Sequence, residues 1–174
     1  MVIRIASRMS IVGILATLWA AVGITPSSAQ DLYTEGPPPE AQTAFDQGKT
    51  ALEQQQYDDA VGLLNKAIRI AEEEYAEAYL LRGLAQMEME EYQQASASFQ
   101  KALQQKEELE DDQLAQAHNG LGEAFLEFGQ EGLGGALENF VEATQIDYKN
   151  KDYLLNLGTT LVKLRSPDQA IKRL

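Results

Sequence analysis

The sequence contains no cysteine and only one histidine, and both absences limit the chemistry it can perform. A chain of 174 residues without cysteine has no disulfides, Cys-ligated zinc, iron–sulfur clusters or thiol nucleophile. Basic residues are also few: 14 Lys and Arg stand against 27 Asp and Glu, for a net charge of −13. Since nucleic-acid affinity comes mostly from basic side chains that neutralise phosphates, no nucleic-acid partner is expected. The hydrophobic fraction of 44% is that of a folded chain.

One long apolar run is present, close to the N-terminus. Residues 11–24 are apolar apart from one threonine and two glycines, follow Arg4 and Arg8, and precede the small residues Ser27 and Ala29. A basic start, an apolar core and an A-x-A-like end predict a secretory signal peptide over residues 1–29. The alternative is an uncleaved membrane anchor over residues 9–25, although Pro26 closes the run short of the ~20 residues that a spanning helix needs. We therefore expect export to a periplasm, a thylakoid lumen or the cell exterior.

Residues 30–40 predict a linker between the signal segment and the folded part. Pro37, Pro38 and Pro39 favour an extended, stiff backbone, and Pro39 is also compatible with the first turn of a following helix. Removal of residues 1–29 takes away two arginines and no acid, so the net charge falls from −13 to −15. Such a protein should repel acidic partners and attract basic ones.

From Ala41 onward the composition favours helices, with no proline before Pro167. Small residues recur there at nearly one period, about three dozen positions long. Glycines that follow a helical turn and alanines near the start of a second helix both keep this period: Gly48, Gly83, Gly122 and Gly158, with Ala60, Ala95, Ala136 and Ala170. Helices that cross closely need small side chains at the crossing, so these positions predict repeated helix pairs.

The larger residues complete this pattern, as in Tyr92, Ala95, Phe99 and Ala102 of the second unit. The chain from Ala41 onward resembles the tetratricopeptide repeat (TPR) family, whose unit of about 34 residues reads W-x2-L-G-x2-Y, then A-x3-F, then A. The resemblance implies an all-α fold, a right-handed solenoid (α-α superhelix) of antiparallel helix pairs with a concave face and about 3.5 repeats. The predicted repeats are 41–75, 76–114, 115–150 and the incomplete 151–174.

Three departures from the family pattern lead to further expectations. The segment 105–113 is about five residues longer than the corresponding segment of a standard unit, which predicts a longer second helix and turn in the second unit. Residues 129–135 are rich in glycine and predict a corner. The last unit should begin its second helix at Ser166-Pro167, and Leu174 falls within that helix with no capping helix after it. We expect that the chain is a truncated product or that a partner covers this end.

No residue pattern indicates catalysis, a cofactor or a metal. His118 is the only histidine, and a helix residue at a repeat joint is its simplest interpretation. The glycines near 120 and 132–135 follow no predicted strand and precede no phosphate-binding lysine. The acidic clusters at 72–77, 88–91 and 107–112 lack the EF-hand spacing, and consecutive acids on a helix point in different directions. We therefore predict a non-enzyme without cofactor or metal.

The family resemblance also implies where a ligand would bind, because the first helix of each pair lines the groove. When the repeat register of the family is applied to this sequence, the implied groove residues are Phe45, Lys49, Leu52, Leu80, Leu84, Met87, Gln116, Asn119, Glu123, Asn156 and Thr159. The apolar stripe Leu80, Leu84 and Met87 is equally compatible with core packing. Family members that grip acidic C-terminal peptides use a Lys/Asn/Arg clamp, whereas Asp46, Leu80 and Leu84 stand in those places here, so that ligand is not expected.

Two functions remain open at this stage. The first is a non-catalytic scaffold or assembly factor of an exported compartment, which binds a peptide or helix segment of a protein partner in the concave groove. The acidic net charge favours a basic partner. A membrane would be involved only through an uncleaved signal segment. The alternative is a structural or self-association segment of a larger protein that stacks through its uncapped C-terminal helix.

Overall fold

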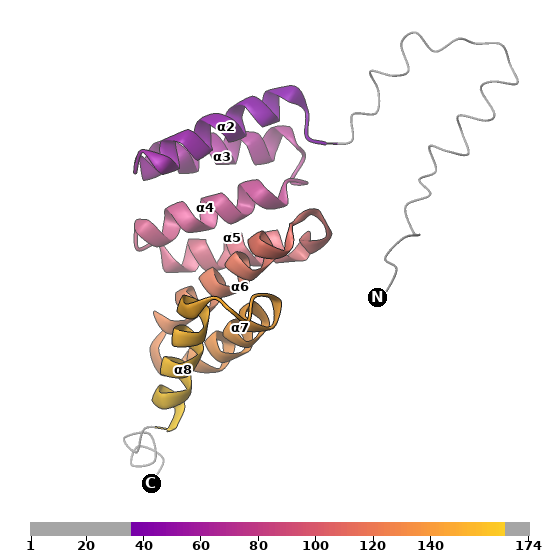
Figure 1. Ribbon diagram of the computed structural model, residues 1–174. Coiled ribbons are helices and arrows are strands. Elements are labelled where there is room, and N and C mark those ends of the chain that lie inside the picture. The colour runs from indigo at the N-terminus through magenta and orange to yellow at the C-terminus, as the bar shows by residue number, and fades with distance from the viewer. Residues whose placement is uncertain (1–35, 166–174) are drawn as a thin grey trace, which may run out of the picture. The chain divides into compact units, whose positions relative to one another are not determined.

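The computed structural model describes residues 36–165, and in this range all regular secondary structure is helical, without a strand, as predicted (Figure 1). The α-helices are α2 (Pro39–Glu53), α3 (Tyr57–Ile70), α4 (Ala76–Glu88), α5 (Tyr92–Gln104), α6 (Asp111–Leu126), α7 (Leu133–Ile146) and α8 (Lys151–Arg165). Two short 3-10 helices, Lys106–Glu108 and Gly129–Glu131, lie in the connections. The predicted signal peptide, the alternative anchor and the C-terminal residues 166–174, with Ala170 and Leu174, lie outside the described residues.

The helices pair as α2 with α3, α4 with α5, and α6 with α7, and each pair packs on the next along the chain (Figure 1). Contacts are most extensive within a pair and next most extensive between the second helix of one pair and the first helix of the following pair. The first helices also touch one another, α2 with α4 and α4 with α6. This arrangement confirms the helical solenoid, and it places α2, α4 and α6 along a common side.

The repeated small residues lie where the helices cross. A Cβ atom added at Gly83 would lie 2.7 Å from the ring of Phe99, and one added at Gly122 would lie 2.7 Å from the ring of Phe140. Gly120 of the next pair also packs against Phe99, where an added Cβ would lie 2.5 Å from the ring. The alanines that mark the second helices, Ala60, Ala95 and Ala136, are fully buried. The register read from the sequence is therefore confirmed for the first three units.

The extra residues between the second and third pairs do not lengthen the second helix, so that prediction was wrong. α5 ends at Gln104 after 13 residues, and a 3-10 turn follows it. The extra length goes instead into α6, which has 16 residues. The backbone N–H of Glu110 donates to Oε1 of Gln113 at 3.1 Å, a contact that fixes the start of α6 before Asp111.

The glycine-rich segment forms the predicted corner before α7. Gly129 has a φ of +67°, a left-handed conformation that glycine adopts without a steric penalty. A Cβ atom on Gly132 would lie 1.8 Å from the carbonyl oxygen of Phe125, so no other residue fits this backbone. The glycines are thus explained by a tight turn between α6 and α7.

A polar network joins the first two pairs. Nε of Arg82 donates to Oγ of Ser98 at 3.0 Å, and another guanidinium nitrogen donates to Oδ1 of Asn65 at 2.7 Å. The Ser98 hydroxyl donates to Oε1 of Gln86 at 2.6 Å, and both of these side chains are buried. Each polar group in this part of the core therefore has a partner, which avoids the cost of burying it alone.

The first described end of the chain is a proline-rich helix start, whereas the last described helix exposes hydrophobic side chains. At the first end, Pro38 has an extended backbone and Pro39 stands in the first turn of α2, as expected. At the other end, α8 carries most of the exposed large hydrophobic residues, namely Leu154, Leu155, Leu161 and Val162.

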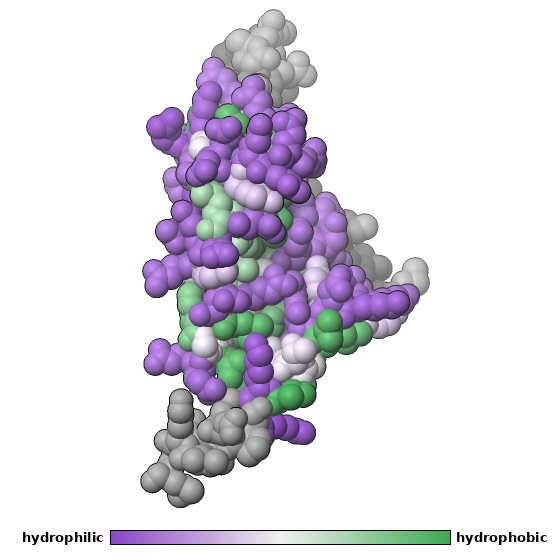
Figure 2. Space-filling model, turned by 90° about the vertical axis from the view of Figure 1, so that its left-hand side faces the viewer, coloured by the Kyte–Doolittle hydropathy of each residue, from purple (hydrophilic) through white to green (hydrophobic). Residues whose placement is uncertain are grey.

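The side seen in Figure 2 is mainly hydrophilic, and its hydrophobic residues show chiefly in the lower half. No helix among residues 36–165 is both long and apolar enough to cross a bilayer.

Candidate functional site

Residues of three first helices, α4, α6 and α8, surround an open hollow of about 450 Å³. Five predicted groove residues meet there: Leu84 from α4, Gln116, Asn119 and Glu123 from α6, and Asn156 from α8. These residues belong to three different repeats, so only the stacking of the repeats brings them together. Gly120, Asp152, Tyr153 and Leu155 complete the lining.

Three of these side chains form a hydrogen-bonded cluster centred on one carboxylate. Oε1 of Glu123 accepts from Nδ2 of Asn119 at 2.9 Å and from Nδ2 of Asn156 at 2.9 Å. Nδ2 of Asn156 also donates to Oδ1 of Asn119 at 3.0 Å. Asn119 and Glu123 are four residues apart and therefore share one face of α6. We call these three residues the Glu123 cluster, and it fixes the position of a half-buried negative charge.

A second hollow, of about 460 Å³, adjoins the first and shares Glu123 with it. Its other lining residues are Met87, Glu88, Glu90, Tyr92, Leu126 and Glu127. We call the two hollows together the α4–α6–α8 groove. Among the described residues that line it there are five carboxylates and no lysine or arginine. Its apolar contacts come mainly from leucines and Met87.

The pKa values of two tyrosines in the groove are raised by burial and by the nearby negative charges. Burial raises the pKa of Tyr153, and the carboxylates of Asp147 and Glu123 raise it further. Burial likewise raises the pKa of Tyr92, with a further contribution from Glu90 and Glu127. Nearby carboxylates disfavour a phenolate because they repel a second negative charge. The same field would favour a positively charged group.

The other predicted groove residues lie elsewhere. Phe45 and Leu80 are core residues, with 3% and 1% of their surface exposed. The ring of Phe45 stacks on Tyr75 at a centroid distance of 4.9 Å. The burial of Leu80 supports the core alternative for the first member of the apolar stripe, whereas Leu84 and Met87 are half-buried and line the groove. Three residues line neither hollow: Leu52 packs against a small separate core cluster, and Lys49 and Thr159 are exposed.

Several lining residues on α8 and at the end of α6 were not among the predicted groove residues. Asp152 and Leu155 stand one helical turn before Asn156 and Thr159, so helical spacing from the predicted residues would have found them. Glu127 follows Glu123 by the same interval. Tyr92 belongs to a second helix and could be assigned only from the structure.

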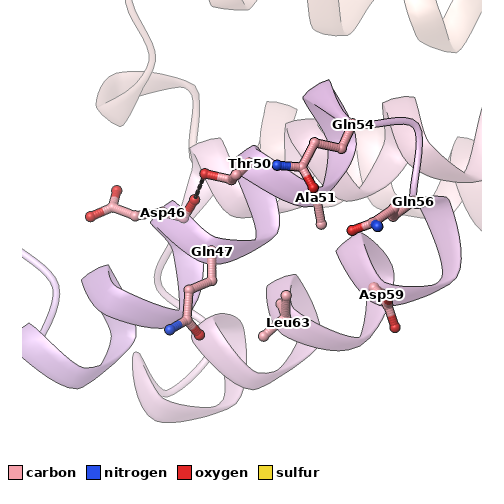
Figure 3. A pocket seen from close by; sticks show the side chains of 8 residues that line it. All are labelled: Asp46, Gln47, Thr50, Ala51, Gln54, Gln56, Asp59 and Leu63. Atoms are coloured by element: carbon pink, nitrogen blue, oxygen red, sulfur yellow. Dashed lines mark hydrogen bonds between the residues drawn. The ribbon is translucent and has the colours of Figure 1, made fainter.

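A third hollow, of about 490 Å³, lies between α2 and α3 (Figure 3). Six of its eight lining residues have polar side chains, and Asp46 and Asp59 lie on opposite sides of it. The Thr50 hydroxyl donates to the Asp46 carbonyl oxygen of its own helix at 2.9 Å, which is a local helix contact. This hollow contains none of the predicted groove residues and no arrangement of a base with a nucleophile.

His118 lies at the joint between α6 and α7. Its Nδ1 is 3.0 Å from Oδ1 of Asn139, whose own amide donates to the carbonyl oxygen of Gly135 at 2.9 Å. The first contact joins the two helices of one pair, and the second, within α7, orients the Asn139 side chain. Within residues 36–165, no three acidic or histidine side chains converge in a way that could hold a metal ion.

Comparison with solved structures shows the same fold in several TPR domains. The chain is 22% identical to the Arabidopsis OM64 TPR domain, with a TM-score of 0.62, over 69% of this chain and 93% of that one. It is 16% identical to the first TPR of Spaghetti (RPAP3) bound to the HSP90 peptide SRMEEVD, with a TM-score of 0.65, over 73% and 94%. For the Sgt2 TPR domain from Aspergillus fumigatus the values are 19%, 0.65, 77% and 85%.

A search among curated proteins finds no significant match. A family model described as tetratricopeptide repeat matches residues 45–110 and 80–133, which together span just over half of the chain. These residues run from the middle of α2 to the start of α7 and include most of the first two helix pairs and most of the groove. The chain belongs to the tetratricopeptide repeat family.

Proposed function

We propose that the protein is a non-catalytic scaffold or assembly factor of an exported compartment, which holds a peptide or helix segment of a partner protein in the α4–α6–α8 groove. The observation that carries the proposal is the meeting of Leu84, Gln116, Asn119, Glu123 and Asn156 in one open hollow. Such a surface combines apolar contact with oriented hydrogen-bonding groups, the two components of peptide recognition.

The similar structures support binding of a peptide rather than a small molecule. The Spaghetti domain is seen with an HSP90 peptide, and the second TPR domain of human RPAP3 is seen with the HSP70 peptide SGPTIEEVD. Among residues 36–165 the serine and threonine hydroxyls donate to backbone carbonyls or to Gln86 and not to a histidine or carboxylate, which favours a binding role. Export rests on residues 1–29, and N-terminal sequencing of the protein from its native source tests it: a start at Gln30 is expected, and a retained Met1 would favour the anchor.

The groove is tested by a matched pair of variants. Leu84→Gln removes a half-buried apolar contact of the groove, whereas Leu137→Gln makes the same change at a half-buried position of α7 outside both hollows. The loss of an apolar side chain from an interface costs about 1.5–3 kcal/mol, which weakens binding more than tenfold. We expect a partner captured from the exported fraction by the full chain and by Leu137→Gln to be lost with Leu84→Gln. Equal capture by all three proteins, with unchanged helicity, would refute the groove.

A second function is favoured by the hydrophobic surface of α8. Leu154, Leu155, Leu161 and Val162 are exposed large hydrophobic residues on this one helix. Self-association through them would make the protein a structural element, in line with the alternative from the sequence. Sedimentation velocity over a hundredfold concentration range tests it: association that Leu161→Glu abolishes supports this function, and a monomer at all concentrations contradicts it.

A further inference from the structure

We propose that the α4–α6–α8 groove selects a basic segment of its partner, in which a lysine or arginine side chain pairs with Glu123 while apolar neighbours contact Leu84 and Met87. This inference rests on the proposed function, since it names the chemistry of the segment that the groove would hold. It assigns a ligand charge opposite to that of the SRMEEVD and SGPTIEEVD peptides seen in the similar structures.

Charge complementarity is the first argument. The lining of the groove contains five carboxylates and, among the described residues, no basic side chain. Asp152 and Glu123 lie on facing helices of the first hollow, and Glu88, Glu90 and Glu127 surround the second. An acidic segment placed here would be repelled at every one of these positions. Like charges brought together at an interface suppress wrong partners, and opposite charges steer the right ones.

The Glu123 cluster is the second argument, because it prepares a carboxylate for a cation. Both donors to Oε1 are side-chain amides, which carry no charge of their own. The carboxylate is thus held in one orientation by neutral groups. A group already fixed in place loses little conformational entropy when a ligand binds, and hydrogen bonds between charged groups are stronger than neutral ones.

Distances along α6 describe the segment further. Glu123 and Glu127 are one turn apart, a rise of about 6 Å. Alternate residues of an extended chain lie about 6.6 Å apart and point to the same side. A segment with basic residues at alternate positions could therefore meet both carboxylates. The residues between them would face the opposite side, and apolar ones next to the basic run could reach Leu84 or the flexible side chain of Met87.

A matched pair of charge variants tests the inference. Glu123→Gln keeps an oxygen that can accept from both asparagines but removes the charge. Glu138→Gln removes the same charge from an exposed position on α7, outside both hollows. The probe is a fluorescein-labelled octapeptide with lysines at alternate central positions and leucines at both ends, and its control replaces each lysine by glutamate. Fluorescence anisotropy with the full chain at low and at near-physiological salt gives the dissociation constants.

We expect the lysine peptide to bind the full chain and the glutamate peptide not to bind. Glu123→Gln should weaken binding of the lysine peptide about tenfold at low salt, in line with the loss of a hydrogen-bonded charge pair. At near-physiological salt Glu138→Gln should weaken it less than about twofold, because Glu138 is exposed outside both hollows and the screening length is then only about 8 Å. Equal losses for the two variants would mean that only net charge matters, and would overturn the inference.

The failures of the two proposals are distinguishable. If Leu84→Gln abolishes capture of the native partner while Glu123→Gln leaves both capture and peptide binding unchanged, the groove binds protein but not through a basic residue, and this inference alone is wrong. If neither variant changes capture of the native partner, the groove is not the binding surface and both proposals are wrong.

Discussion

The same substitution, glycine to alanine, should change stability in opposite directions at two helical positions. Gly62 lies within α3, and an added Cβ atom there would meet no heavy atom within 4 Å. Gly120 lies within α6, and the added Cβ would come within 2.5 to 2.9 Å of three ring atoms of Phe99. The pair therefore separates helix propensity from packing at the crossing.

The magnitudes follow from these two environments. In an open helical position alanine is more favourable than glycine by about 0.8–1.0 kcal/mol, so Gly62→Ala should stabilise the fold by about that amount. At Gly120 the propensity gain is the same, but overpacking costs about 1–3 kcal/mol. The ring of Phe99 has little room to move aside, because Gly83 packs against the same ring. We therefore place the cost near the upper end and expect Gly120→Ala to destabilise the fold by about 1–2 kcal/mol after the propensity gain is subtracted.

Urea denaturation of the full chain, followed by circular dichroism, measures both effects. The two variants should differ by about 2–3 kcal/mol at an unchanged m-value, since neither alters the surface exposed on unfolding. In a Phe99→Leu background the smaller side chain should remove most of the cost of Gly120→Ala, a coupling that a double-mutant cycle reports. If Gly120→Ala stabilises the protein as much as Gly62→Ala, the proposed packing of α5 against α6 is refuted.

Three further predictions concern single residues. Gln55 has a φ of 61°, so Gln55→Gly should stabilise the fold by about 1 kcal/mol, whereas Gln47→Gly within α2 should destabilise it by a similar amount in the same urea assay. Ser98→Ala removes a hydroxyl bonded to two side chains of α4 and should cost about 1–3 kcal/mol, while Ser96→Ala, which loses only a bond within its own helix, should cost less. Burial, reinforced by a neighbouring carboxylate, raises the pKa of Tyr79 to about 12. The contribution of the neutral Tyr79 hydroxyl to stability is therefore complete below pH 10 and is lost as the pH rises through 12. Tyr79→Phe should weaken the pH dependence of unfolding in that window.

The fold could be predicted because its determinants are local and periodic. In each of the first two units, a large residue of the second helix follows the marker glycine at the same spacing: Leu64 follows Gly48, and Phe99 follows Gly83. In the structure the two residues of each pair are in contact. A repeat supplies the same evidence several times, so one irregular unit does not obscure it. The segment at 105–113 has no second copy, and for that reason its conformation could not be read from the pattern.

The candidate site was harder to predict because a register position determines a side of the helix but not the depth of the side chain. Three positions before the marker glycines stand Phe45, Leu80, Asn119 and Leu155. The first two are buried, Asn119 is 9% exposed and hydrogen-bonded, and Leu155 is 64% exposed. Large apolar side chains in the first two units fill the space between the first helices, whereas the third unit places an amide there.

This change along the solenoid has a consequence for recognition. Where Phe45 and Leu80 fill the side shared by α2 and α4, the surface offers few polar groups at depth, and residues such as Lys49 are left on the outside. Where Asn119 takes the same position, its side-chain amide and that of Asn156 donate hydrogen bonds to the carboxylate of Glu123. The hydrogen-bonding part of the recognition should therefore come from the third and fourth units, while the second unit adds Leu84 and Met87 as apolar contacts and the first unit supports the stack. An asparagine in place of Leu80, which is 1% exposed, would bury an amide in the core, so this position cannot be converted into a second polar site without loss of stability.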